Sequence, residues 1–296
     1  MLLNASGCLD ALTAPGTVGQ LDAFVTKTVT PLPREGNRPI RIAEIEVGML
    51  NSIGLANPGR DRFLAETLPS LRKLGKPLWV SVGGFTAQEY AETCRMLGDV
   101  TIELNLSCPN VDEAPESAAE IVAACRKATS LPLYAKLSPS SWDIAEVARA
   151  VEAAGADGLS LVNTIRGMKL DGELRPVLGS ATGGLSGPAL KPVALAAVHA
   201  CFRATTLPIV GMGGVATGRD AVELLAVGAN SVALGTMLFS DPSAPARIRQ
   251  ELDTELATLG LSSVDDACGI AHENALPRRK HLDMRSRVSK KLLQKS

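Results

Sequence analysis

The chain has 296 residues, so it holds one large domain or two small ones, and a chain of this size buries roughly three quarters of the surface that it exposes when unfolded. Its hydrophobic fraction of 46%, charged fraction of 21% and net charge of -1 are those of an ordinary globular protein and give no general attraction to nucleic acid or anionic membranes. Because there is no run of about eighteen apolar residues and no charged leader typical of a signal peptide, we expect a cytoplasmic protein.

Short apolar runs alternate with helix-period stretches over almost the whole chain, which is typical of a parallel sheet with crossover helices. The expected strands are Leu2–Ala5, Ala23–Lys27, Leu78–Val82, Val100–Asn105, Leu133–Lys136, Gly158–Asn163, Ile209–Gly211 and Ser231–Leu234. The expected helices lie near Arg62–Leu74, Ala87–Leu97, Ser117–Ala128, Ile144–Ala154, Pro192–Ala204, Arg219–Ala226 and Ala244–Leu259. This α/β pattern predicts a (β/α)8 TIM barrel with extended loops over its C-terminal face, a fold of usually ~250 residues. The alternative is an open doubly wound sheet, but the first strand–helix turn lacks Gly-x-Gly-x-x-Gly.

Two segments are longer than a barrel loop needs, and loops of this length are usually lids or insertions. They are Thr28–Arg60 and the glycine-rich Ile165–Leu190. Within the first, Ile40–Val47 alternates apolar and polar residues like a small accessory strand. We expect residues 1–260 to form the barrel and residues 261–296 to form a helical, basic C-terminal extension.

Polar residues recur where the expected strands end. In a barrel the functional site is built at the C-terminal ends of the strands, so these side chains should point toward a common centre. The residues in chain order are Ser6, Lys27, Ser81, Asn105, Lys136, Asn163, Gly211, Gly213, Gly214, Gly235 and Thr236. A ring of this composition predicts a polar ligand site at the barrel mouth.

The glycines after the last two strands let backbone N–H groups approach a phosphate, and a helix beginning near Arg219 should add the positive end of its dipole. The alternative is that these are plain tight turns without a ligand. Lys27 and Lys136 are costly at half-buried strand ends unless they meet an anion or an electron-rich ring, although each alone could be a surface lysine with a buried stem. Together these residues suit an anionic cofactor such as a flavin, whose reduced ring carries negative charge that an ammonium stabilises.

Cys108 is the one cysteine of the six in a suspicious setting, because it follows a strand in a polar loop between Asn105 and Asn110. No Cys-x-x-Cys pair occurs, which argues against a zinc or iron–sulfur site made by this chain alone. A cysteine is often a small buried hydrophobe, but in this loop its thiol can serve as a general base. The carboxamides of Asn51, Asn105, Asn110 and Asn163 offer donors and acceptors to a planar polar ligand, although loop asparagines also form turns.

Several motifs, in matching order and spacing, resemble class 1 dihydroorotate dehydrogenases over about residues 3 to 255. They are Asn4–Gly7, Thr26–Thr28, Arg34–Asn37, Leu50–Gly59, Asn105–Asn110, Ala135–Pro139, Val162–Thr164, Gly183–Pro188 and Gly211–Gly214. The resemblance implies an FMN-containing barrel that oxidises (S)-dihydroorotate to orotate in pyrimidine biosynthesis. Cys108 would remove the C5 proton while hydride passes from C6 to flavin N5.

The resemblance also assigns the binding residues. The substrate would be held by Lys27, Asn51, Ser52, Ile53, Gly54, Leu55, Asn105, Asn110, Asn163 and Thr164. FMN would be held by Ser6, Lys27, Thr28, Ser81, Asn105, Lys136, Val162, Gly187, Gly213, Gly214, Gly235 and Thr236. Ser81 stands where family members usually have an asparagine, and no metal site is implied.

The motif Asn163–Met168 and the segment Gly184–Pro188 resemble class 1B, whose catalytic subunit pairs with a subunit that bears FAD and a 2Fe–2S cluster and passes electrons to NAD. Arg34–Asn37 is nearer to the fumarate-using homodimers of class 1A, and we favour class 1B. We therefore expect a homodimer, or a heterotetramer with an electron-transfer subunit, and no nucleic acid or membrane partner. Two other functions stay open: a dihydropyrimidine dehydrogenase-like reductase, whose substrate lacks a carboxylate, and a catalytically silent barrel subunit.

Overall fold

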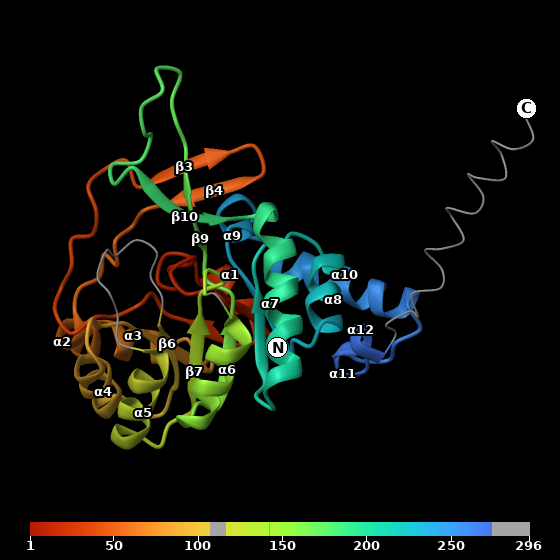
Figure 1. The fold of residues 1–296 in the computed structure, drawn as a ribbon, viewed down its shortest axis with the longest axis horizontal. Coiled ribbons are helices and arrows are strands. Elements are labelled where there is room, and N and C mark those ends of the chain that lie inside the picture. The colour runs from red at the N-terminus through yellow and green to blue at the C-terminus, as the bar shows by residue number, and fades with distance from the viewer. Residues whose placement is uncertain (107–116, 142, 274–296) are drawn as a thin grey trace, which may run out of the picture.

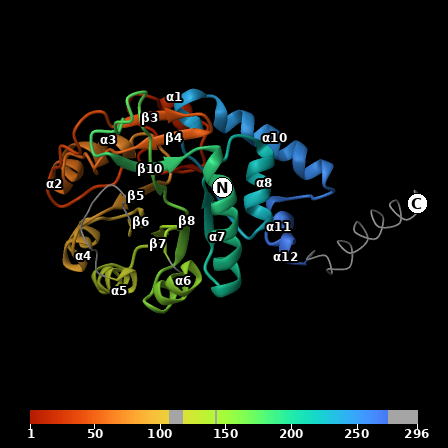
Figure 2. The same ribbon diagram turned by 45° about the horizontal axis from the view of Figure 1, so that its top comes forward.

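Eight parallel strands close into a barrel. The computed structural model describes residues 1–106, 117–141 and 143–273. The strands follow the order β1-β12-β11-β8-β7-β6-β5-β2, and the two end strands, β1 and β2, lie side by side. Helices pack around the outside of these strands (Figures 1 and 2). The predicted (β/α)8 barrel is confirmed, and the open sheet is excluded.

The barrel strands agree with the expected ones to within a few residues at each end. They are β1 (Leu2–Asn4), β2 (Phe24–Val25), β5 (Leu78–Val82), β6 (Thr101–Asn105), β7 (Leu133–Leu137), β8 (Gly158–Leu161), β11 (Ile209–Met212) and β12 (Ser231–Leu234). Residues that alternate along each strand face two different cores, because successive side chains of a strand point to opposite sides. One core lies between the sheet and the helices, and a smaller one fills the barrel.

The helices include all seven that the apolar periodicity predicts, together with short ones that it did not predict, near residues 15–19, 188–190, 237–240, 264–267 and 270–273. They are α1 (Pro15–Gly19), α2 (Arg60–Arg62), the π-helix η1 (Phe63–Thr67), α3 (Leu68–Arg72), α4 (Ala87–Met96), α5 (Ala118–Ala128), α6 (Ile144–Ala153), the 3-10 helix η2 (Pro188–Leu190), α7 (Lys191–Ala204), α8 (Gly218–Ala226), α9 (Met237–Ser240), α10 (Ala244–Thr258), α11 (Val264–Ala267) and α12 (Ile270–Glu273). Local capping fixes several starts: Ser117 and Glu120 form a capping box at α5, and Thr217 and Asp220 form one at α8.

The two long segments meet in an antiparallel sheet above the strand ends, which Figure 1 shows at the top of the molecule. Its order is β3 (Ile42–Ile45), β4 (Gly48–Asn51), β10 (Thr182–Ser186) and β9 (Ile165–Met168). Ala43, Leu50 and Leu178 form a small core beneath it. The sequence predicted one accessory strand in the first segment but none in the second. Gly183 and Gly184 weaken the strand signal of β10, and close contact requires both. A Cβ on Gly183 would lie 2.5 Å from the Asn51 carbonyl oxygen of β4, and a Cβ on Gly184 would collide with the Thr164 side chain.

Inside the barrel, apolar side chains fill the bottom. The rings of Trp79 and Tyr134 lie 4.4 Å apart between centroids. Val25 and Val210 belong to the same cluster. Gly158 makes room for this packing, because a Cβ at that position would lie 2.2 Å from the Tyr134 ring. The lower barrel is therefore a mainly apolar, packed core.

The seam between β1 and β2 is closed by a side chain. The fully buried Asn4 donates from Nδ2 to the Val25 carbonyl oxygen (2.7 Å), and its Oδ1 accepts from the Val25 N–H (2.9 Å). Below it, the Asp22 N–H donates to the Leu2 carbonyl oxygen, and the Asp22 carboxylate accepts from the Leu2 N–H. The carboxamide thus reproduces the donor and acceptor of a neighbouring strand.

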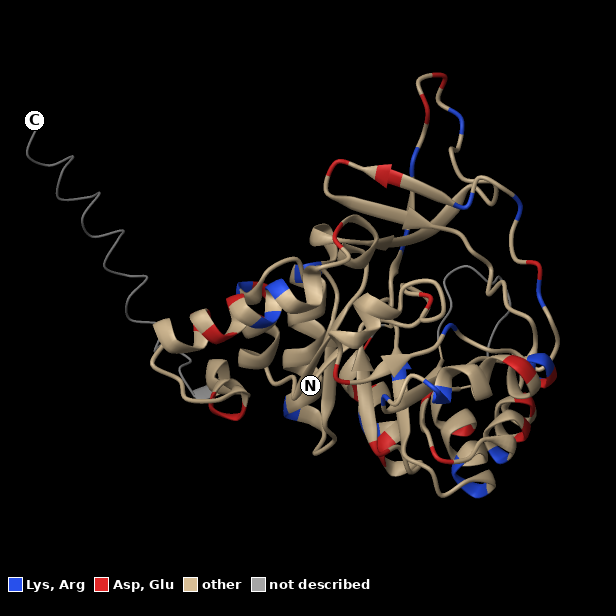
Figure 3. Ribbon diagram, turned by 180° about the vertical axis from the view of Figure 1, so that it is seen from behind, with Lys and Arg blue, Asp and Glu red and all other residues tan. Residues whose placement is uncertain are grey.

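The C-terminal part of the described chain packs against α8. Both α11 and α12 contact that helix, and the ring of His272 stacks on His199 with centroids 4.2 Å apart. Basic and acidic residues are interspersed along the outer helices and loops (Figure 3). Among the described residues, no helix is long and apolar enough to cross a membrane. The expected basic stretch after residue 273 lies outside the described residues, and the division at residue 260 stays a proposal.

We predict that Asn4→Ala lowers the free energy of unfolding by about 2–4 kcal/mol, because it leaves a buried N–H and a buried carbonyl of Val25 without partners. Urea unfolding followed by circular dichroism measures this. Asn230→Ala is the matched control: Asn230 also accepts a backbone N–H, from Ile209, but it is exposed, so water can replace it and the cost should stay below about 1 kcal/mol. Equal costs for the two variants would contradict a special role for the seam.

Candidate functional site

A cavity of about 590 Å³ opens at the carboxyl ends of the barrel strands, below the accessory sheet. Its volume is in the range of small-molecule sites. Most of the predicted site residues line it, namely Ser6, Lys27, Thr28, Asn51, Ile53, Leu55, Asn105, Lys136, Val162, Asn163, Thr164, Gly187, Gly213, Gly214, Gly235 and Thr236. Residues that are more than 200 positions apart in the sequence therefore share one site.

Three predicted site residues do not line the cavity: Ser81 supports a residue that does, and Ser52 and Gly54 pack against Asn37 beside it. Ser81 is fully buried, and its hydroxyl is hydrogen-bonded to that of Thr28 (2.9 Å). Ser52 is also fully buried and accepts from Nδ2 of Asn37. Gly54 has a positive φ of 72°, and a Cβ there would lie 2.3 Å from the Asn37 side chain, so only glycine fits. Two further predicted residues, Cys108 and Asn110, lie outside the described residues.

One side of the cavity is a chain of hydrogen-bonded polar groups that crosses the barrel mouth. Asn105 Nδ2 donates to Thr28 Oγ1 (3.1 Å), and Asn163 Nδ2 donates to Asn105 Oδ1 (3.1 Å). The Thr164 N–H then donates to Asn163 Oδ1 (2.9 Å). Each carboxamide is oriented by a neighbour, so its remaining donors and acceptors have fixed directions. Such a wall can read the edge of a planar ligand that carries amide groups.

Two ammonium groups enter the cavity at the base of this wall. Lys136 is buried, donates from Nζ to Ser6 Oγ (2.9 Å) and lies 3.5 Å from the carboxylate of Glu103. Lys27 follows β2 and reaches the cavity with a more exposed side chain. Loss of hydration among the cavity walls lowers the pKa of the Lys27 ammonium, and the positive charge of Arg41 adds to the effect. Both lysines are placed to meet an anionic or electron-rich ligand.

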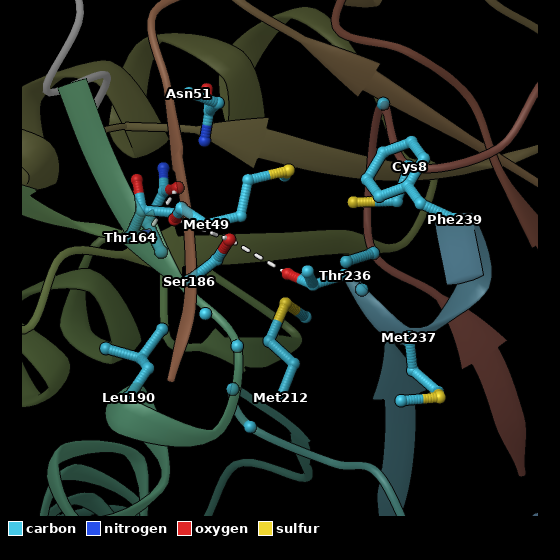
Figure 4. A pocket seen from close by; sticks show the side chains of 18 of the residues that line it. Cys8, Met49, Asn51, Thr164, Ser186, Leu190, Met212, Thr236, Met237 and Phe239 are labelled. Atoms are coloured by element: carbon cyan, nitrogen blue, oxygen red, sulfur yellow. Dashed lines mark hydrogen bonds between the residues drawn. The ribbon is translucent and has the colours of Figure 1, made fainter. Parts of the chain in front are cut away.

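The opposite end of the cavity is lined by glycine turns. In the described part of the chain, the backbone N–H groups of Gly213, Gly214 and Gly235 donate to no protein acceptor. Beside them, Thr236 Oγ1 donates to Ser186 Oγ (2.8 Å; Figure 4). Unpaired N–H groups that converge on a cavity are typical of phosphate sites. Among the residues that the structure describes, no cluster of three or more metal-binding side chains occurs.

The sequence predicted that the helix beginning near Arg219 adds the positive end of its dipole to a phosphate site, but the start of α8 is arranged differently. At the start of α8, the N–H groups of Ala216 and Thr217 donate to the carboxylate of Asp220, and the N–H of Gly218 donates to Glu251. These N–H groups are therefore not available to a ligand. Asp220 also accepts from Nζ of Lys191 (2.6 Å), which fixes the segment directly after the glycine turn.

Sequence reasoning missed Asn57 as a support of the ligand loop. Its Oδ1 accepts from the N–H groups of Thr30 and Gly59, and its Nδ2 donates to Thr30 Oγ1 and to the Leu55 carbonyl oxygen. These four bonds hold the loop in which Leu55 adopts a positive φ of 57°. Asn57 stands in an Asn-Pro-Gly triplet, which predicts only a turn.

Sequence reasoning also missed several apolar and sulfur-containing residues that line the cavity. Cys8, Met49, Met212 and Phe239 line the cavity, with Cys8 and Phe239 on one side and Asn51, Thr164 and Ser186 on the other (Figure 4). Burial raises the pKa of the Cys8 thiol, although the charges of Lys136 and Lys27 oppose this effect. The only sequence signal for Cys8 was its position two residues after Ser6. A thiol kept neutral in this way behaves as part of an apolar wall.

Comparison with known proteins identifies related chains. Residues 1–256 match the family model described as dihydroorotate dehydrogenase. A Listeria monocytogenes protein named dihydroorotate dehydrogenase B (NAD(+)), catalytic subunit, is 42% identical over 280 residues, which cover 90% of this chain and 92% of that protein. A Latilactobacillus sakei protein of the same name is 45% identical over 277 residues, with 88% and 90% coverage. The crystal structure of an Eimeria tenella dihydroorotate dehydrogenase in complex with ferulenol has the same fold, with a TM-score of 0.77, 23% identity, and coverage of 92% of this chain and 85% of that one.

We predict that Asp220→Asn lowers the free energy of unfolding by about 1–3 kcal/mol at pH 7, because charge-assisted hydrogen bonds are lost. Burial opposes ionisation, but the bonds from Lys191, Ala216 and Thr217 outweigh it and lower the pKa of Asp220. A lowered pKa stabilises the fold above the unfolded value of about 4, and this stabilisation is lost as the pH falls through the lower folded value.

Urea unfolding of the wild type and the Asp220→Asn variant at several pH values between 7 and 3 measures this contribution. The difference in the free energy of unfolding between the two proteins should shrink as the pH falls below about 4. Asp171→Asn is the control, since Asp171 also accepts two backbone N–H groups but lies on an exposed loop. A difference for Asp220→Asn that does not change with pH would contradict the charge-based account.

Proposed function

The chain belongs to the dihydroorotate dehydrogenase family, and from this premise we propose that it is an FMN enzyme that oxidises (S)-dihydroorotate to orotate in pyrimidine biosynthesis. The observation that carries the proposal is the distribution of groups along one cavity. Unpaired glycine N–H groups lie at one end, buried Lys136 lies at the base, and the oriented carboxamides of Asn105 and Asn163 lie at the other end.

The residues present fit FMN. The N–H groups of Gly213, Gly214 and Gly235 suit its phosphate, and the buried ammonium of Lys136 suits the electron-rich edge of its ring. Thr28 and Ser6 add hydroxyl groups, each already oriented by a hydrogen bond. When bound, FMN supplies the hydride acceptor, at N5 of its ring.

The opposite end of the cavity suits the substrate. The Asn51–Leu55 loop, held by Asn57, and the pair Asn163–Thr164 offer donors and acceptors for the amide edges of a dihydropyrimidine. Lys27 carries the positive charge that a substrate carboxylate needs. This favours dihydroorotate over a dihydropyrimidine without a carboxylate, because an unpaired ammonium in the cavity would cost binding free energy.

Cys108 is the proposed base, on the basis of its place in the family motif Asn105–Asn110. It would accept the proton from C5 of the substrate while the hydride leaves C6. A thiol with an ordinary pKa near 8.5 is only a few per cent ionised at pH 7, so the proposal predicts reduction that becomes faster as the pH rises.

The names of the relatives support a proposal for the electron acceptor and for a partner subunit. Both curated bacterial relatives are named dihydroorotate dehydrogenase B (NAD(+)), catalytic subunit. We propose that this chain is likewise a class 1B catalytic subunit, and that a partner subunit with FAD and a 2Fe–2S cluster passes its electrons to NAD. The proposed assembly is a homodimer of this chain extended to a heterotetramer by that partner.

We predict that the purified protein is yellow and that its flavin absorbance near 450 nm bleaches when dihydroorotate is added without oxygen. Dihydrouracil, which lacks the carboxylate, is the matched control and should bleach it at least about a hundredfold more slowly, because Lys27 then stays unpaired. Anaerobic stopped-flow absorbance gives both rates. If flavin is bound and dihydroorotate does not reduce it, the proposed activity is contradicted.

We predict that Cys108→Ala slows flavin reduction by dihydroorotate about a hundredfold or more at neutral pH, as expected when a general base is lost. FMN content should stay unchanged, which the absorbance ratio of flavin to protein measures. Cys8→Ala tests the thiol that lines the described cavity, whose raised pKa makes it a poor base at pH 7. A large loss of the reduction rate in Cys8→Ala together with a normal rate in Cys108→Ala would show that Cys108 is not the base.

A further inference from the structure

A carboxylate is buried inside the barrel directly below the cavity. Glu103 lies on β6 with an exposed fraction of 1%. Its neighbours Ile102 and Leu104 belong to the core between sheet and helices, so its own side chain faces the barrel interior. Neither oxygen of its carboxylate has a hydrogen-bond partner among the described residues, and its one ion-pair contact is Lys136 Nζ at 3.5 Å from Oε1.

This carboxylate is unfavourable for stability alone. Burying an ionised carboxyl group costs several kcal/mol, and one long ion-pair contact without further hydrogen bonds repays only part of that cost. The positions in register with Glu103 on the neighbouring strands are Ser81 and Tyr134, and the apolar Val25, Trp79 and Val210 belong to the interior cluster of the barrel. An apolar residue at position 103 would continue this packing. The position of Glu103 therefore calls for an explanation in the electrostatics of the cavity above it.

The ammonium of Lys136 separates Glu103 from the cavity. Lys136 is 4% exposed and lines the cavity, while Glu103 does not. The ammonium donates upward to Ser6 Oγ at 2.9 Å and meets the Glu103 carboxylate on its buried side. Its positive charge is thus compensated from below before any ligand binds. A ligand that gains negative charge beside Lys136 meets an ion pair instead of a free cation.

We propose that Glu103 is a positioning residue that holds the Lys136 ammonium from below and lowers the reduction potential of the flavin. This inference rests on the FMN site proposed above. Reduction brings negative charge to the flavin ring; the ammonium favours that charge and the carboxylate opposes it. Because charges in a protein interior act over several ångströms with little screening, the opposition reaches the ring. A lower potential makes the reduced flavin a stronger donor to the next electron acceptor.

The test is the reduction potential of the flavin in Glu103→Gln, which keeps the shape of the side chain and removes its charge. We expect the two-electron equilibrium constant for reduction to rise about tenfold, which equals a shift of about +30 mV. Equilibration with a redox dye of known potential under xanthine oxidase turnover measures it without any dihydroorotate. Sulfite affinity of the oxidised flavin gives a second readout and should increase in parallel, because sulfite binding also places negative charge on the ring.

Ser160→Ala is the matched control. Ser160 faces the same interior from β8, and its buried hydroxyl likewise has no hydrogen-bond partner in the described part of the chain, but it carries no charge. The equilibrium constant for flavin reduction in this variant should stay within about twofold of the wild-type value. An equal shift in Ser160→Ala would overturn the proposal, because packing or hydration of the barrel would then explain both variants. An unchanged potential in Glu103→Gln would overturn it as well, since the carboxyl group would then be uncharged or too remote.

Glu103→Ala removes the same charge and lets water fill the space, so it replaces Glu103→Gln if that variant does not fold, and it should shift the potential in the same direction. A wild-type protein that holds no FMN would refute the proposed function together with this inference. Flavin bound normally, with a potential that Glu103 substitution leaves unmoved, would refute this inference alone.

Discussion

The structure depends on the closure of the barrel between β1 and β2. β2 contributes only two residues to the sheet, and the carboxamide of Asn4 supplies the donor and acceptor that a longer neighbouring strand would provide. Closure brings Ser6, which follows β1, and Lys27, which follows β2, to the same mouth. Because Lys136 on β7 donates to Ser6, the seam also fixes one contact of the ammonium at the base of the cavity.

The mouth of the barrel then separates its polar groups by type. Backbone N–H groups gather at the glycine turns after β11 and β12, carboxamides gather after β6 and β8, and positive charge lies between them. Supporting groups stand behind the mouth: Ser81 bonds to Thr28, Asn57 donates to the Leu55 carbonyl oxygen, and Asp220 accepts from the N–H of Ala216. Binding residues held in this way lose little conformational freedom when a ligand arrives.

The sequence predicted the barrel and most of the cavity because both follow from local rules. Period-2 and period-3.6 patterns located the strands and helices, and the barrel rule placed strand-end residues such as Asn105, Lys136 and Asn163 in one site. The pairing of β10 with β4 was missed because its glycines carry no strand signal and become necessary only through close backbone contact.

Other features depend on which segments meet, and this information is not local. Asn4 reads as part of a motif, yet its partner is 21 residues away across the seam. Glu103 reads as an ordinary strand residue, and only the closed barrel shows that it points inward beneath Lys136. Cys8 and Phe239 become cavity walls only when their turns approach each other at the mouth.

A crystal structure of the yellow protein grown with orotate tests the central claim most directly. The account predicts a flavin phosphate at the N–H groups of Gly213, Gly214 and Gly235, the ring beside Lys136, and orotate between the Asn51 loop and Asn163, with its carboxylate at Lys27. Flavin or orotate bound outside this cavity, or a ring whose polar edge faces away from Lys136, would contradict it.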